Sequence, residues 1–555
     1  MKEILKTITK KEWRFVLLMA LAVIIITGVP YAVGFFSAPP RYVYTGLHSL
    51  SPGDVPVYYS YITQVAEGNL TVRNLFTSEP QTYGTFNIWW GLVGGVARVF
   101  SLSAPLVFQL FRLAAAFGFV FLAYFFLAFF FSSVLQRKIT LGLLLFSSGL
   151  GAYFAAGLDQ IQFDPNAARY PWPIDLWLTE SITFNALLQT SHFIVSLALM
   201  LLILLLAYLA IEKKRWWYAV VAGLLSLVYF NFHPYYLPII YGVPGLYILV
   251  RTLIEKKITW SHVGRWTVLV LLSLPSVAYH VFLIKAEPVI GLRALQNVTL
   301  ISSPFYVLIG YGLLGPLAVV GVYLLWKRNL FSRPFQYLGI WLLLNLTLIA
   351  INAPFQSRFT QGVHVALVIF STAGLFGIAE RLRQKLTSRR YNFWINNPTL
   401  LMVGFLVLFT PSTLFMFFRD LYILSVQPGV IKELFFWSPD FIAATDYLGA
   451  QPRGALVLAA EIPSRFIPGL TGQTVFLGHM HETLNFEARE LELRWFYRPK
   501  TSDQARINFL QRHGIDYLLF GPYEKQLGPF DPAGKNYLTP VVQTDTVVLY
   551  QVTAE

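Results

Sequence analysis

The sequence predicts an all-α polytopic membrane bundle of about eleven transmembrane helices, followed by a small extracytoplasmic α/β domain. Three observations lead to this prediction: 56% of the 555 residues are hydrophobic, only 13% are charged, and the apolar residues gather in long runs. The mean hydropathy of +0.56 is too high for a soluble protein of this length. We therefore expect most of the chain to lie in a lipid bilayer.

Eleven apolar runs, most of them of roughly 18 residues or more, are long enough to cross the hydrocarbon core. The first follows a basic N-terminus and lacks a small-residue cleavage signature, so it is expected to be a retained helix. A further apolar segment, 86–100, is short and contains Arg98, and it is expected to be an interfacial helix. The expected spans lie near residues 15–36, 104–131, 139–157, 188–211, 217–232, 236–254, 266–284, 305–326, 336–353, 362–379 and 399–418.

The positions of Lys and Arg predict the orientation of these helices. With a cytoplasmic N-terminus, the inner segments carry 22 Lys and Arg residues, whereas the outer loops before the C-terminal region carry six. This asymmetry follows the positive-inside rule. The formal charge of +14 therefore comes from short clusters between apolar runs, and no nucleic-acid partner is expected. An odd number of spans then places the C-terminal region outside the cytoplasm.

Two domains are expected: a membrane domain at 1–420, with long outer loops at 37–85 and 157–187, and an extracytoplasmic α/β domain at 421–555. In the second domain, the segments 455–458, 517–520 and 547–550 have the pattern of short buried strands, and 488–496 and 504–513 that of helices. Gly514 is the expected C-cap of the last helix. The absence of cysteine excludes disulfides, cysteine-ligated metal centres and a cysteine nucleophile.

Asp54, just beyond the first long apolar run, is the candidate catalytic residue. It follows the turn-forming sequence Ser51-Pro52-Gly53 and precedes a predicted helix at 57–67. A carboxylate at this place is able to act as a general base toward a hydroxyl group at the membrane surface. The alternative is structural, because Asp is also a common N-cap residue.

Other outer segments supply candidate substrate ligands. Glu180 and His192 lie near the start of a predicted span, His233 lies in an outer turn, and Arg358 is a cation where the positive-inside rule disfavours one. The guanidinium of Arg358 matches the oxygens of a phosphate or pyrophosphate. Snorkelling to the headgroups, capping of a turn and contact with an anionic lipid are the alternatives. The remaining candidates are Glu79, Asp159, Asp164, Lys285 and Arg293.

The sequence indicates no metal site. The segment Gly478-His479-Met480-His481-Glu482 holds two histidines and a glutamate, but it lacks the helical spacing of a zinc protease. No cofactor is assigned, and a divalent metal is compatible with the sequence but not supported by it.

The first outer loop resembles that of the GT-C superfamily of membrane glycosyltransferases, which includes protein O-mannosyltransferases and aminoarabinose transferases. The similarity rests on Gly53-Asp54 with Tyr58-Tyr59-Ser60-Tyr61-Ile62, on Ala66-Glu67-Gly68 and on Phe76-Thr77-Ser78-Glu79-Pro80, together with the expected topology. It covers about the first 420 residues. It implies transfer of a sugar from a polyprenyl-phosphate donor to a glycan, lipid or protein acceptor, with Asp54 as the general base.

The resemblance also suggests roles for the other candidates. Arg358, with Arg293 or Lys285, would hold the polyprenyl phosphate, and Glu180, His192 and His233 would shape the sugar pocket. Many members carry two adjacent acids, whereas Val55 follows Asp54 here, so Asp159, Asp164 or Glu180 would supply a second charge.

Two other functions stay open at this point: a transporter or flippase of lipid-linked saccharides, and a non-catalytic assembly or sensor protein. Transporters concentrate polar residues and broken helices near the middle of the membrane. The ionisable residues of this chain collect at one face instead, which favours a one-sided enzyme.

Overall fold

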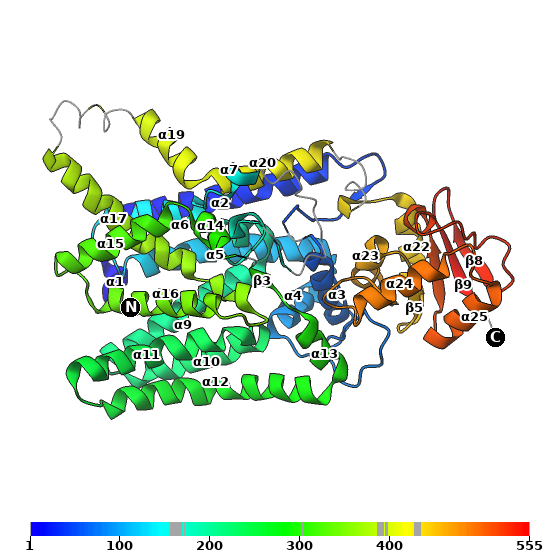
Figure 1. Ribbon diagram of the computed structural model, residues 1–555, viewed down its shortest axis with the longest axis horizontal. Helices are drawn as coiled ribbons and strands as arrows, with labels where there is room; N and C mark the ends of the chain where they lie inside the picture. Colours follow the sequence, from blue (N-terminus) through cyan, green and yellow to red (C-terminus); the bar gives the residue numbers. More distant parts are fainter. Residues whose placement is uncertain are drawn as a thin grey trace. The chain divides into compact units, whose positions relative to one another are not determined.

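The computed structural model describes residues 2–50, 52–155, 169–170, 172–301, 303–385, 393, 398–426 and 434–553. The chain forms two compact units (Figure 1), and each is described by itself. The helical unit comprises Met1–Pro30, Phe111–His280 and Val298–Asp420. The mixed unit comprises Tyr31–Leu110, Val281–Asn297 and Leu421–Glu555.

Long apolar helices make up the helical unit. Helices α9, α10 and α11 run side by side in Figure 1. Short 3₁₀ turns and one two-residue parallel strand pair, β2 (Arg169–Tyr170) with β3 (Leu300–Ile301), connect some of the helices. Four of the helices, α2, α5, α12 and α20, also carry residues of the mixed unit. The elements are α1 (Lys2–Thr7), α2 (Lys10–Phe36), α5 (Ala104–Leu127), α6 (Val134–Phe146), α7 (Gly151–Ala155), η1 (Ile174–Leu176), α8 (Thr183–Gln189), α9 (Ser191–Glu212), α10 (Trp216–Phe232), η2 (Pro234–Tyr236), α11 (Leu237–Glu255), α12 (Trp260–Ala286), α14 (Pro304–Tyr311), α15 (Leu314–Lys327), α16 (Arg333–Ala350), η3 (Gln356–Thr360), α17 (Val363–Lys385), α19 (Pro398–Phe409) and α20 (Pro411–Val426).

The multi-pass membrane character is confirmed by the number of long apolar helices. Among the described residues, seven helices are long and apolar enough to cross a bilayer, or nine if the bent pairs α14–α15 and α19–α20 each count as one span. The other two expected spans are α10, with 17 residues, and α16, and neither is in this set. The number eleven and the orientation stay predictions.

Glycines allow close helix packing in the helical unit. A Cβ atom on Gly321 of α15 would lie 1.9 Å from the carbonyl oxygen of Phe370 on α17, and one on Gly374 would lie 2.3 Å from that of Leu317. Small residues at helix contacts are typical of membrane proteins, where packing replaces the hydrophobic effect between helices.

The mixed unit contains a five-stranded sheet with the order β6-β5-β7-β9-β8. The pairs β6-β5 and β5-β7 are parallel, and the pairs with β9 are antiparallel. Helices α24 and α25 bury Phe496 and Leu510 against Leu458 and Leu518 of the sheet. The expected strands and helices of this region are confirmed, and Gly514 caps α25 with φ of 65°. The elements are β5 (Leu456–Leu458), β6 (Thr474–Val475), α24 (Phe486–Phe496), α25 (Asp503–His513), β7 (Tyr517–Phe520), α26 (Pro522–Lys525), β8 (Leu538–Gln543) and β9 (Val548–Val552).

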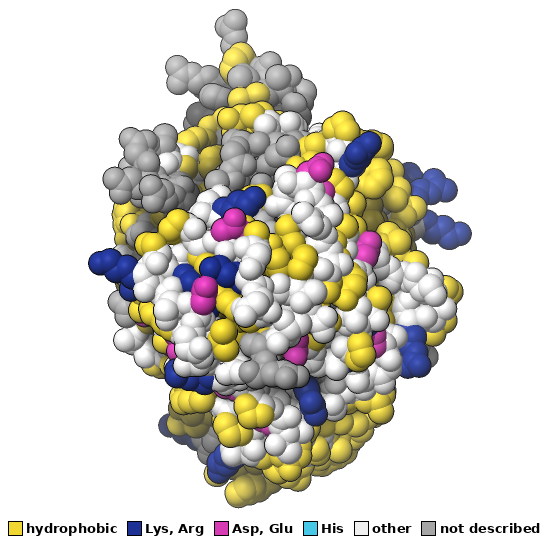
Figure 2. Space-filling model, turned by 90° about the vertical axis from the view of Figure 1, so that its right-hand side faces the viewer, with side chains coloured by type: hydrophobic (Ala, Val, Ile, Leu, Met, Phe, Trp, Pro, Cys, Tyr) yellow, Lys and Arg dark blue, Asp and Glu magenta, His cyan; other side chains and the backbone are white. Residues whose placement is uncertain are grey.

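Figure 2 shows one face of the molecule, on which charged, polar and hydrophobic side chains are all present. Basic and acidic side chains are scattered singly among polar and apolar atoms there, without a large patch of one sign.

Segments far apart in the sequence share the mixed unit. Helix α3 (Asp54–Ala66) packs on α4 (Ile88–Phe100) and on α23 (Glu461–Thr471), and β1 (Val43–Tyr44) pairs with β4 (Phe436–Trp437). Helix α13 (Pro288–Gln296) joins them through Glu287, whose carboxylate accepts the backbone N–H groups of Thr82 and Tyr83 at 2.7 and 2.8 Å. Helix α22 (Pro439–Ala450) completes this unit. The expected helices at 57–67 and 86–100 are confirmed as helices, and the interfacial position of the second stays a prediction.

Two neighbouring glycines of α4 should respond differently to alanine. A Cβ atom on Gly94 would lie 2.5 Å from Val65 Cβ, whereas one on Gly95 has no atom within 4 Å. We expect Gly94→Ala to lower the free energy of unfolding by about 1–3 kcal/mol, because the α3–α4 contact must open. Gly95→Ala should be neutral or slightly stabilising, because Ala favours helix. Thermal unfolding of the purified protein measures both, and equal melting temperatures would contradict the packing.

Candidate functional site

Asp54 is the first residue of α3. The N-cap position belongs to Gly53, whose backbone is already helical with φ of −68° and ψ of −34°. The alternative that Asp54 serves as the N-cap is therefore wrong. Its carboxylate still lies in the first helical turn, where the helix dipole favours negative charge. The side chain is 37% exposed, so a substrate can reach it.

His479 of the C-terminal region contacts this carboxylate. Its Nε2 lies 3.3 Å from Asp54 Oδ1, and its side chain is only 10% exposed. The backbone N–H of His481 donates to His479 Nδ1 at 3.2 Å. A ring nitrogen that accepts a hydrogen bond carries no proton, so Nε2 is the ring nitrogen that bears one. The Nε2–H group therefore points at the Asp54 carboxylate.

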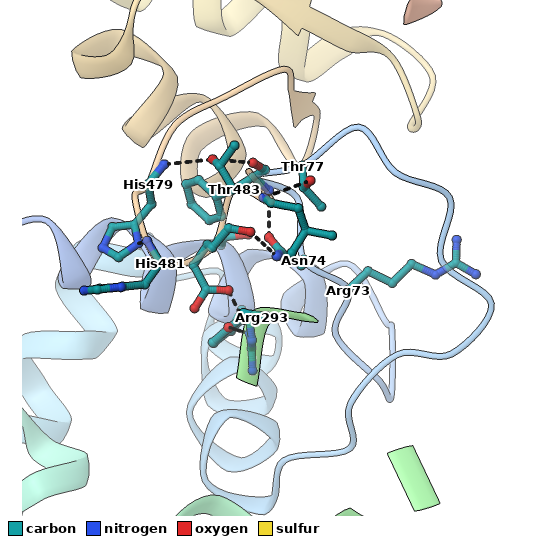
Figure 3. Close-up of polar contacts among 12 residues, drawn as sticks. Arg73, Asn74, Thr77, Arg293, His479, His481 and Thr483 are labelled. Carbon is teal, nitrogen blue, oxygen red and sulfur yellow. Dashed lines mark hydrogen bonds and ion pairs between the residues drawn. The ribbon is translucent and has the colours of Figure 1, made fainter. Parts of the chain in front are cut away.

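The segment that carries His479, residues 478–484, is called here the histidine segment, and it is bonded to the first outer loop (Figure 3). Thr483 Oγ donates to the carbonyl oxygen of Phe76 at 2.7 Å and accepts the N–H groups of Gly478 and His479 at 3.0 and 3.3 Å. Asn74 Nδ2 donates to the carbonyl oxygen of Glu482 at 2.6 Å. These bonds fix the segment, and with it the His479 ring.

Helix α13 holds the same segment from another direction. Gln296 Nε2 donates to the carbonyl oxygens of His481 and Thr483 at 3.2 and 2.8 Å. Arg293 donates to Glu482 Oε2 at 2.8 Å and to the Tyr61 hydroxyl at 3.1 Å. Burial and the neighbouring Glu482 raise the pKa of Tyr61 to about 12, so the phenol stays protonated. The Glu482 carboxylate raises the pKa of Arg293 above its ordinary value, so this guanidinium is a permanent cation.

One face of α3 thus carries several groups of the site. Asp54, Tyr58 and Tyr61 are spaced by four and three residues, which places them on one side of the helix. Tyr58 stacks on Trp90 of α4 with ring centroids 4.9 Å apart. The rise of a helix separates Asp54 from Tyr61 by about 10 Å.

Arg465 of α23 is a second cation beside the turn that precedes Asp54. One of its terminal nitrogens would lie 3.5 Å from a Cβ atom on Gly53. The side chain is 5% exposed and pairs with Glu461. Its Nε has no hydrogen-bond partner among the residues that the structure describes.

The predicted candidates Glu79, Lys285 and Arg293 belong to the same unit as Asp54. Arg489 donates to Glu79 at 2.8 Å, and the Thr77 hydroxyl also donates to this carboxylate. Burial alone would raise the pKa of Glu79, but these bonds from Thr77 and Arg489 lower it overall. Lys285 lies on the exposed side of α12.

Four other candidates form a polar cluster in the helical unit. Arg358 donates to Glu180, and its guanidinium lies over the Phe193 ring at 5.9 Å. The rings of His192 and His233 are 5.4 Å apart. Burial lowers the pKa of His233 well below its ordinary value, and the charges of His192 and Arg358 lower it further. His233 is therefore a neutral imidazole. Asp159 and Asp164 lie outside the described residues.

The arrangement around Asp54 is suited to proton transfer. A partly exposed carboxylate is oriented by a buried imidazole N–H, and fixed guanidinium groups lie on α13 and α23. Within the part of the chain that the structure describes, no three His, Asp or Glu side chains converge as metal ligands do. The sequence did not predict His479 or Arg465 as site residues. His479 stood out only as part of a possible metal pattern, and Arg465 did not stand out at all.

The fold matches solved GT-C membrane glycosyltransferases over most of the chain at low identity. The oligosaccharyltransferase of Archaeoglobus fulgidus, tethered with an acceptor peptide containing the NVT sequon, matches with a TM-score of 0.51 and 13% identity over 92% of this chain and 69% of that chain. Its apo form gives 0.51 and 13% over 90% and 69%. ArnT from Cupriavidus metallidurans bound to undecaprenyl phosphate gives 0.49 and 15% over 95% and 97%.

Comparisons of the sequence with protein families and with curated proteins find no match. The structural likeness, at 13% identity, shows the fold alone.

The Glu79–Arg489 pair predicts a stability difference that depends on pH. The folded-state pKa of Glu79 is lowered from 4.5, so its contribution is present at pH values above 4.5 and is lost as pH falls through the folded value. We expect Glu79→Gln to melt below the wild type at pH 7, and the gap to shrink in acid. Thermal unfolding across pH measures it, with the exposed Glu487→Gln on α24 as control. A gap that grows as pH falls would contradict the assignment.

Proposed function

We propose that this protein is a membrane glycosyltransferase that moves a sugar from a polyprenyl-phosphate-linked donor to an acceptor on the extracytoplasmic face. The observation that carries the proposal is the 3.3 Å contact of Asp54 Oδ1 with His479 Nε2. A base at an accessible helix start, oriented by a buried N–H group, is what activation of an acceptor hydroxyl requires. The likeness in fold to an oligosaccharyltransferase supports the proposal.

In the proposed reaction, the acceptor oxygen attacks the anomeric carbon of the donor sugar. As the new bond between carbon and the acceptor oxygen forms, Asp54 takes the proton of the acceptor hydroxyl. The bond between the anomeric carbon and the phosphate oxygen breaks, and its electron pair leaves with the polyprenyl phosphate. The configuration at the anomeric carbon is inverted. His479 does not exchange this proton but holds the carboxylate in place.

Cations are needed where the phosphate leaves, because negative charge develops there. We assign this role to Arg358 with Arg293 or Lys285. Arg293 is held rigidly by Tyr61 and Glu482, which suits a fixed electrostatic partner. Lys285 is exposed and keeps the freedom of a flexible side chain.

The remaining candidates are assigned to binding of the sugar. Glu180, His192 and the neutral His233 offer hydrogen-bonding groups in the helical unit, as hydroxyl recognition needs. Glu79 is kept as a candidate ligand, although its carboxylate already holds α24 through Arg489. The proposed partners are the donor lipid, the bilayer and a glycan, lipid or protein acceptor, and the proposed location is a prokaryotic plasma membrane.

Asp54→Asn should abolish transfer. The loss of a general base is expected to reduce the rate by about 10²- to 10⁴-fold. Release of polyprenyl phosphate from a panel of polyprenyl-phosphate hexoses and pentoses measures it, as does complementation of the surface glycan in a deletion strain. The matched control is Asp446→Asn, an exposed acid on α22. Wild-type turnover by Asp54→Asn, with normal folding, would refute Asp54 as the base, whereas no turnover by the wild type with any donor of the panel would contradict the enzyme and favour a flippase.

His479 should act as a positioning residue. We expect His479→Ala to lower kcat by about 10- to 100-fold with little change in KM, because the carboxylate is free to rotate. His479→Gln should recover part of the rate, since its amide N–H reaches the position of Nε2. His481→Ala keeps the backbone N–H that bonds His479 and should retain the rate. Equal loss in the Ala and Gln variants, or a lower melting temperature, would indicate a structural role instead.

A further inference from the structure

The mixed unit contains a cavity of about 160 Å³ that the proposed reaction does not use. It lies among β4, α22, α23, α26 and the ends of β7 and β9. Its walls are largely aromatic, and polar groups line it as well. The residues on which the argument rests are Phe436, Trp437, Phe466, Ser438, Glu524 and Thr546.

The buried end of the cavity presents a donor without an acceptor. Trp437 is 5% exposed, and its indole Nε1–H has no hydrogen-bond partner among the described residues. The great majority of buried N–H groups in folded proteins are paired. Because Trp437 lines the cavity, a ligand oxygen in it would satisfy this group.

Acceptor and donor groups line the same cavity as this indole. Glu524 is buried, and its two carboxylate oxygens accept the backbone N–H groups of Ala460 and Gly521 at 2.6 and 2.8 Å. A carboxylate has about four acceptor positions. Ser438 Oγ accepts the N–H of Phe441 at 3.1 Å, a bond that does not use its own proton.

The cavity opens to the surface at one end. Pro522 and Thr546 are exposed, whereas Phe436, Trp437 and Phe466 at the other end are buried. A ligand can therefore enter past Thr546 and place one end against the indole.

The geometry points to a binding site for one ring of an uncharged saccharide. Aromatic walls pack against the apolar face of a sugar ring, while the Trp437 N–H and the Glu524 carboxylate bond its oxygens and hydroxyl groups. An engineered cavity of about 150 Å³ holds a benzene ring, so the volume fits a single six-membered ring. An acidic sugar would meet the Glu524 carboxylate, and a purely apolar ring would leave the Trp437 N–H unpaired. Further sugars of a longer glycan would leave through the mouth at Thr546.

The test measures binding alone, on the full chain in lipid nanodiscs, which avoids glycoside detergents. Saturation-transfer NMR with a panel of methyl hexopyranosides and pentopyranosides should show binding at millimolar concentration. Trp437→Phe keeps the ring but removes the N–H, and we expect it to weaken binding about tenfold. Trp495→Phe, in the same unit but outside the cavity lining, is the matched control and should bind like the wild type.

Two further variants make the result decisive. Thr546→Trp should close the mouth and abolish binding, which serves as the test if Trp437→Phe fails to fold. Asp54→Asn should bind glycosides normally, so failure of this site and failure of the proposed transferase can be told apart. No binding of any glycoside, unchanged binding by both cavity variants, or binding of phenol in place of every glycoside would overturn the inference.

Discussion

The hydrogen bonds between the histidine segment and the first outer loop are the constraint on which the candidate site depends. Thr483 and Phe76 are 407 positions apart, yet the Thr483 hydroxyl bonds the Phe76 carbonyl oxygen at 2.7 Å. A buried polar group left without a partner costs about 1–3 kcal/mol, so each such bond strongly favours this one register. The position of His479 opposite Asp54 follows from that register.

Helix α3 is the element that gathers these contacts. Tyr59 lies against Gly469 of α23, where a Cβ atom would come within 2.8 Å of Tyr59 Cβ, and Thr63 donates to the Gly469 carbonyl oxygen at 2.6 Å. Val65 lies against Gly94 of α4. The two close approaches at glycine leave α3 little freedom to shift or rotate. Its N-terminus, with Asp54, is therefore presented in a fixed orientation.

The sequence predicted most elements of this fold because their signals are local. Apolar runs, the helix at 57–67 and the cap at Gly514 depend on residues within a few turns of one another. The sequence did not predict Gly53 as the N-cap of α3, because Asp is a more common N-cap residue than Gly and Asp54 is the next residue. The span count differs between sequence and structure because α10, with 17 residues, and α16, which contains Arg333, Gln336 and Asn345, fall outside the set of long apolar helices.

The site was only half predictable, for a different reason. Asp54 stood out by its position after the first long apolar run, but its partners come from the other end of the chain. In a sequence, two histidines separated by one residue suggest at most a metal site. Only the fold shows that His479 faces the Asp54 carboxylate while His481 supplies a backbone N–H to the His479 ring. Arg465 lies in an amphipathic helix and has no distinguishing sequence context.

Two acids of the first outer loop, Asp54 and Glu79, have different surroundings, and these set the chemistry of each carboxylate. Glu79 is bonded by a guanidinium and a hydroxyl, which stabilise its charged form and make it a weak base. Asp54 contacts the His479 ring through Nε2, and the Nδ1 atom of that ring accepts the backbone N–H of His481. His479 and Arg465 are buried while the Asp54 side chain is 37% exposed, so part of the Asp54 carboxylate stays accessible from outside the protein.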